Sequence, residues 1–189
     1  MLATVLFFVV SSVVVFTYWT KIGEIVLTLS ISKHVGLAVY SCILFAIVNT
    51  VVVVLLVWYL NYLYEVHRFP KIWLMIASAM AVGLLIASYF PFTGEGLWNS
   101  VVHRAASWTM FSMAAVFCLV TLWSLRTRWP IVIGLVLLAF GALCLLWVTC
   151  FADFFWDYVL IIESSFILLV FLFILAIPLG KRDQFPTTV

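Results

Sequence analysis

Charged side chains are scarce in this sequence. Asp, Glu, Lys and Arg make up 8% of the 189 residues, whereas apolar residues make up 68%. Soluble domains carry about 25% charged and about 45–50% apolar residues, so the polar side chains here are too few to cover a soluble globule. The formal net charge is only +2, and no long basic tract of the kind that binds nucleic acid is present. The composition therefore predicts an integral membrane protein with no nucleic-acid partner.

The familiar catalytic and metal-binding motifs are also missing. There is no H-E-x-x-H, no G-x-S-x-G and no glycine-rich phosphate loop, and the three histidines do not form a metal-ligand pattern. The cysteines form no C-x-x-C pair and lie in or beside apolar runs, where we expect them to pack as small apolar residues. We therefore predict no metal, no cofactor and no catalytic residue, and the sequence favours a protein that is not an enzyme.

Long apolar runs are abundant. A membrane-spanning helix needs about 20 largely apolar residues, with a range of about 17–25. Six runs qualify, and they predict an all-α, polytopic membrane bundle of six transmembrane helices in a single domain, 1–189. The runs are roughly 2–19, 35–64, 72–90, 101–125, 130–151 and 156–179. The first has no basic residue before it and no A-x-A site after it, which favours a retained helix over a signal peptide. The second is too long to cross perpendicularly, so it must tilt or project.

The basic residues indicate an orientation. Six spans place both termini on one side, together with six basic residues: Arg68, Lys71, Arg126, Arg128, Lys181 and Arg182. The other side carries Lys21, Lys33 and Arg104. Because Lys and Arg accumulate in cytoplasmic loops, we predict that both termini are cytoplasmic.

Glu163 is the sharpest single signal. It lies in "DYVLIIESSFILLV", about two turns inside the last run and about 10 Å from Trp156 at 1.5 Å per residue. An acid within a membrane span is costly, should face the bundle interior and should have a partner. Two interpretations stay open. Glu163 is either a functional acid that binds a proton, an ion or a headgroup, or a structural acid. The structural acid is in an ion pair, or is protonated and hydrogen-bonded to Ser164 or another helix.

His103 and Arg104 stand side by side where the fourth run begins, on the same outer side as Glu163. His103 shares a helical face with Ser100 and Ser107 through its i, i+3 and i+4 spacing. Arg104 can pair with a carboxylate or hold a lipid phosphate through two parallel bonds. Alternatively, Arg104 only extends its side chain to the headgroup layer (snorkelling), which requires no function. The predicted lipid- or partner-binding residues are His103, Arg104, Glu163, Asp157 and Glu95.

A bundle can gather the outer polar residues into one polar mouth. They come from four separate stretches: Lys33, His34, Glu95, His103, Arg104, Asp153, Asp157 and Glu163. Such a mouth suits a zwitterionic headgroup or proton-coupled gating. We predict a non-catalytic or transport-like protein whose mouth engages the headgroups of membrane lipids or the membrane helices of another protein. Two alternatives remain. One is an intramembrane lipid-modifying enzyme with Glu163 and His103 as acid and base, and the other is a structural subunit of a larger membrane complex.

Three features spread over most of the chain are shared with a known group of membrane proteins. A polar outer stretch, "TLSISKHVG", follows the first apolar run. The third run leads into "FPFTGEGLWNSVVHRAA", where an H-x-x-A motif, His103 and Ala106, opens the fourth. An acid, Glu163, stands early in the last run, in "LIIESSF". In these features the chain resembles the Frag/DRAM/Sfk group of six-helix membrane proteins and its prokaryotic relatives of unknown function. The resemblance implies a six-helix bundle and a link to lipid distribution, GPI-anchor remodelling or autophagy, often without demonstrated catalysis.

Overall fold

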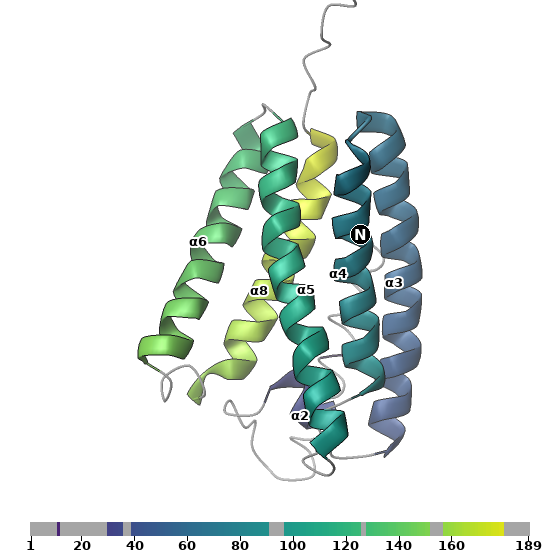
Figure 1. Cartoon of the computed structure of the whole chain (residues 1–189), viewed down its shortest axis with the longest axis vertical. Coiled ribbons are helices and arrows are strands. Elements are labelled where there is room, and N and C mark those ends of the chain that lie inside the picture. The colour runs from purple at the N-terminus through teal and green to yellow at the C-terminus, as the bar shows by residue number, and fades with distance from the viewer. Residues whose placement is uncertain are drawn as a thin grey trace, which may run out of the picture.

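A computed structural model describes residues 11, 30–35, 39–90, 97–125, 128–151 and 157–179. Within these residues every regular element is a helix (Figure 1). The elements are α2 (Ile31–Val35), α3 (Val39–His67), α4 (Lys71–Tyr89), α5 (Leu97–Ser124), α6 (Arg128–Cys150), α8 (Val159–Ala176) and the 3-10 turn η1 (Ile177–Leu179). Five stretches of this part of the chain are long and apolar enough to cross a membrane: Ser41–His67, Lys71–Tyr89, Ser100–Ser124, Arg128–Cys150 and Val159–Leu179.

Five of the six predicted runs are therefore found as helices, with boundaries that differ by a few residues. The predicted first span, 2–19, lies outside the described residues except for Ser11, so the count of six spans stays a prediction. The predicted start of the second helix, at residue 35, was wrong. Val35 ends the short helix α2, and α3 begins at Val39.

The five long helices alternate in direction. Figure 1 shows α3, α4, α5 and α6 in order across the view, with α8 beside α5 and α6. Each consecutive pair from α3 to α6 is in contact, and α8 packs against α6. Edge-to-face ring contacts also join α8 to α5, since Phe166 meets Phe111 at 5.0 Å and Phe173 meets Phe117 at 6.2 Å between ring centres. The last helix thus lies inside the bundle instead of closing its edge.

A tight turn joins α3 to α4. Arg68 takes a left-handed conformation, with φ of 48°, and the Phe69 N–H donates to the Tyr64 carbonyl at 3.3 Å. This is the pattern of a Schellman helix end, which usually uses glycine at the left-handed position. Because the two helices are flush at this turn, the 29-residue α3 extends about 15 Å beyond the 19-residue α4 at the other end, beside α2.

Aromatic rings fill the core near the α3–α4 turn. The Trp73 ring stacks on Phe69 at 4.5 Å and tilts against Phe117 at 4.9 Å, measured between ring centres. Trp73 is fully buried, and its indole N–H donates to the Thr121 hydroxyl at 2.7 Å. Since a buried indole N–H needs an acceptor, this bond also ties α4 to α5.

The fully buried residues of helix α6 lie in its first half only. Its buried residues are Pro130, Gly134 and Leu137, and no residue of α6 beyond Leu137 is buried. At Gly134 an added Cβ would lie 2.8 Å from a Leu122 side-chain atom and 2.9 Å from a Phe173 ring atom, so glycine allows α5 and α8 to come close there. Toward the α2 end, α6 diverges from α5 (Figure 1).

Candidate functional site

The divergence of α5 and α6 leaves a cavity of about 750 Å³ at the α2 end of the bundle. This volume falls in the range of about 300–1,000 Å³ that is typical of small-molecule sites. Helices α5, α6 and α8 form its walls, and residues of the α2 segment, Ser30 and Lys33, border it.

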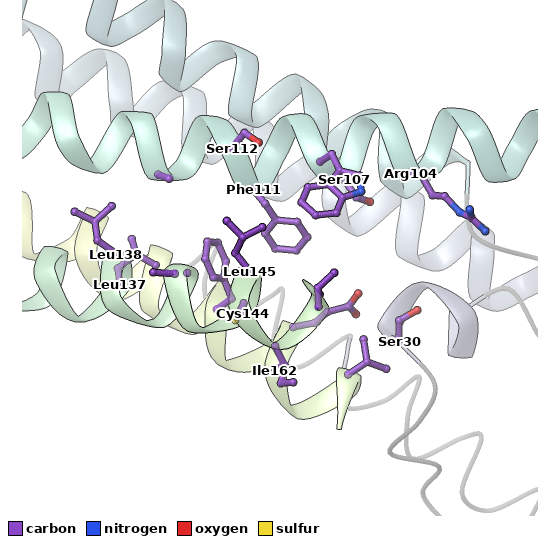
Figure 2. A pocket seen from close by; sticks show the side chains of 18 of the residues that line it. Ser30, Arg104, Ser107, Phe111, Ser112, Leu137, Leu138, Cys144, Leu145 and Ile162 are labelled. Carbon is purple, nitrogen blue, oxygen red and sulfur yellow. The ribbon is translucent and has the colours of Figure 1, made fainter. Parts of the chain in front are cut away.

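The cavity is polar at one end and apolar along the rest of its length. Figure 2 shows Ser30 and Arg104 at one end and Leu137 and Leu138 at the other, with Phe111 between them. The polar residues that line it are Ser30, Lys33, His103, Arg104, Ser107 and Glu163, with Ser112 farther along α5. The site is therefore amphipathic along the direction of the helices.

Three of the five predicted site residues lie on this one cavity. His103 and Arg104 come from α5 and Glu163 comes from α8, and all three line its wall. Asp157 is exposed just before α8 and does not line the cavity, and Glu95 lies outside the described residues.

Glu163 caps the short helix α2. Its Oε2 accepts the Ile31 N–H at 3.0 Å, and the hydroxyl of Ser30, the residue before α2, accepts the Lys33 N–H at 3.3 Å. These two acceptors satisfy backbone donors that the first turn of a helix leaves open. Glu163 thus has a structural partner on another segment, as one of the two interpretations proposed.

The depth predicted for Glu163 was wrong. Helix α8 begins at Val159 and not at Trp156, so Glu163 lies about 6 Å from the start of the helix, roughly one turn inside. This shallower position places the carboxylate level with α2 and the first turns of α5, and that is why it reaches the polar end of the cavity.

His103 joins α5 to the end of α4. Its Nδ1 lies 3.1 Å from the Ala87 carbonyl oxygen, so Nδ1–H donates, and its Nε2 lies 3.4 Å from the Ser107 hydroxyl. The residue four positions after Ala87 is Pro91, which has no N–H to offer that carbonyl. His103 therefore supplies from α5 the donor that α4 lacks, and this holds the neighbouring Arg104 at the cavity.

Arg104 and Lys33 bring positive charge to the polar end. Arg104 is exposed, and Lys33 is half-buried on α2. Together with Glu163 they give this end two cations and one carboxylate.

Ser30 and the apolar wall from α6 were not predicted as part of the site. The role of Ser30 could have been inferred from the local sequence, because serine just before a helical stretch is a common N-cap. The α6 wall had none.

Among the described residues, no group of three or more His, Cys, Asp or Glu side chains is placed to hold a metal ion. Comparisons of the chain with protein-family models, with curated proteins and with solved structures found no match. The resemblance to the Frag/DRAM/Sfk group accordingly stays a prediction. Five apolar helices of spanning length are consistent with an integral membrane protein.

Proposed function

We propose that this membrane protein binds a phosphate-bearing lipid headgroup at the polar end of the cavity and does not modify it chemically. The observation that carries the proposal is that Lys33, Arg104 and Glu163 line one end of a single cavity whose other walls are apolar.

The charges suit such a headgroup. A guanidinium binds phosphate oxygens through parallel, charge-assisted hydrogen bonds, and an ammonium adds a second positive charge. The Glu163 carboxylate complements the ammonium of a zwitterionic headgroup. These attractions are stronger beside apolar walls than in water, because the effective dielectric constant is lower there.

The geometry favours binding over catalysis. A lipid-modifying enzyme would need Glu163 and His103 free to exchange protons with a substrate. Instead, Glu163 accepts the Ile31 N–H, and His103 is bonded to the Ala87 carbonyl and the Ser107 hydroxyl. In this proposal His103 is a positioning residue, since it fixes the start of α5 and with it Arg104.

The proposal is tested by the lipids that stay bound to the protein. The purified protein is placed in nanodiscs that contain phosphatidic acid, phosphatidylethanolamine and phosphatidylcholine, and bound lipids are measured by native mass spectrometry. We expect bound phospholipid in the wild type and about tenfold weaker binding in Arg104→Gln, because a charge-assisted contact is lost. Arg128→Gln removes the same charge from an exposed residue that does not line the cavity and should bind like the wild type. Equal binding by Arg104→Gln and wild type would contradict the proposal.

A further inference from the structure

We infer that the cavity takes up an acyl chain as well as a headgroup, so the ligand is an amphiphile with one chain held between α5 and the second half of α6. This inference rests on the proposed headgroup site and specifies the ligand class: a phosphate-bearing lipid bound head and tail together, from the leaflet on the α2 side.

The length of the cavity fits one leaflet. On α5 its lining runs from His103 and Arg104 to Ala115, and on α6 from Val148 back to Leu137. Each stretch from Arg104 to Ala115 and from Val148 to Leu137 covers about 17 Å at 1.5 Å per residue. This is about half of the roughly 30 Å hydrocarbon core of a bilayer. A headgroup at Arg104 would therefore have a wall beside it for the depth of its own leaflet.

The chemistry of the wall changes along this length in the same sense as a lipid. Beyond the first turns of α5, the lining is mainly Phe111, Leu137, Leu138 and Phe166. Apart from Ser112 and Cys144, no polar side chain from the described residues lines this part. The Ser112 hydroxyl lies on the α5 wall in Figure 2, away from the Arg104 end. Apolar walls of this kind offer dispersion contacts to a chain and little to a free phosphate ion.

The second half of α6 provides lateral access. None of its residues beyond Leu137 is buried, and Ala142 and Leu145 line the cavity while remaining exposed. The wall of the cavity is therefore open toward the surroundings of the helix, which for a spanning segment are the lipid chains. A chain can enter sideways without first leaving the bilayer.

The test uses lysophosphatidic acid with a photoreactive diazirine in the middle of its acyl chain, in nanodiscs with the full-length protein. After illumination, the modified residues are identified by mass spectrometry. We expect adducts on cavity residues such as Phe111, Leu138 and Phe166. Adducts confined to outward-facing residues of α5, such as Leu119 and Trp123, would overturn the inference.

Two substitutions on α6 give a matched pair. Ala142→Phe places a ring in the chain path, whereas Ala139→Phe places the same ring one turn earlier, on an exposed position that does not line the cavity. We expect Ala142→Phe to lower the yield of cavity adducts about tenfold, because it occupies the volume the chain needs. Ala139→Phe should leave the yield unchanged, which also shows that a phenylalanine on α6 is tolerated. Equal yields from both variants would overturn the inference.

Competition separates the two proposals. Unlabelled lysophosphatidic acid should suppress the cavity adducts, and inorganic phosphate or glycerol 3-phosphate at the same concentration should not. If inorganic phosphate or glycerol 3-phosphate competes as well as lysophosphatidic acid, the site binds the headgroup alone. The acyl-chain inference then fails, and the proposed function stands. If adducts form in the cavity but are insensitive to Arg104→Gln, the headgroup proposal fails, and the inference that depends on it fails with it.

Discussion

At the scale of single residues, Glu163 combines a structural contact with a place in the cavity wall. Its Oε2 holds the first N–H of α2, and its side chain also lines the cavity. An acid in a membrane span is costly, and here a backbone donor on another segment compensates part of that cost. Lys33, also a lining residue, lies on the helix that Glu163 caps. The carboxylate therefore helps to determine where a cation of the proposed headgroup site stands.

Substitutions at Glu163 should separate the acceptor from the charge. Glu163→Leu leaves the Ile31 N–H without its acceptor, and we expect a loss of about 1–3 kcal/mol in the free energy of unfolding. Glu163→Gln keeps an oxygen at the same place and should stay within about 1 kcal/mol of the wild type. Denaturant unfolding in detergent, followed by circular dichroism, measures both. If Glu163→Gln and Glu163→Leu lower the free energy of unfolding equally, the hydrogen bond to the Ile31 N–H does not contribute to stability, and the expectation is wrong.

The sequence singled out three residues that line one cavity, but it did not indicate the groups to which they are hydrogen-bonded. Scarcity of charge singled out His103, Arg104 and Glu163, because each ionisable group in such a chain needs a reason. The partners they have, the Ala87 carbonyl for His103 and the Ile31 N–H for Glu163, are backbone groups. Every residue carries such groups, so no side-chain pattern marks them. Pro91 was the one available hint, since it removes a donor four residues after Ala87.

At the scale of helices, the distance between neighbouring helices differs from one contact to another. Helices α4 and α5 come close together at Gly83, where an added Cβ would lie 3.0 Å from the Ala106 oxygen and from the Met110 nitrogen. Both atoms belong to the backbone and cannot rotate away. At Gly141, by contrast, an added Cβ would meet only a Phe166 ring atom, at an ordinary 3.4 Å. Small residues at helix contacts are a common route to close packing in membranes.

This difference predicts opposite outcomes for the same substitution. Gly83→Ala should force α4 and α5 apart and lower the free energy of unfolding by about 1–3 kcal/mol. Gly141→Ala meets no backbone and should be neutral or slightly stabilising, because alanine is the better helix former. Thermal unfolding of the two variants in the same detergent is the measurement. Equal midpoints would show that the α4–α5 contact at Gly83 is looser than its geometry indicates.

Helix boundaries followed from the sequence to within a few residues because long apolar runs and short joins leave little choice. The small helix α2 did not. Five residues are too few to show a helical period, and α2 is held by Ser30 before it and by Glu163 from α8. A helix that depends on a residue 132 positions away has no local signature. For the same reason the cavity could not be predicted, since it depends on the divergence of α6 from α5.

At the scale of the whole molecule, the described basic residues separate between the two ends of the bundle. Arg68, Lys71 and Arg128 stand at the α3–α4 turn and the start of α6, opposite the end that holds the cavity. Lys33 and Arg104 line the cavity. If the positive-inside rule sets the orientation, the cavity lies on the outer side and its leaflet is the outer one.

Two exposed positions at opposite ends test this orientation. In a chain whose other cysteines are replaced by alanine, Cys150 at the end of α6 should react with a membrane-impermeant thiol reagent in intact cells. A single cysteine at Glu65→Cys, exposed near the end of α3, should react only after permeabilisation. Glu65 is a suitable site, because acidic residues have little influence on topology. The reverse labelling pattern would place the cavity on the cytoplasmic side.

The bond between His103 and Ala87 has a consequence for the order of assembly. Carbonyls in the last turn of a helix have no N–H four positions later within the same helix, so they need a donor from elsewhere. Here the donor comes from sixteen positions away, on the following helix. The Phe90 N–H closes the last turn of α4 on the Ile86 carbonyl, but the Ala87 carbonyl gains the His103 donor only when α5 lies beside α4. During biogenesis the two helices should settle as a hairpin, and a chain halted before His103 would leave the Ala87 carbonyl without this donor.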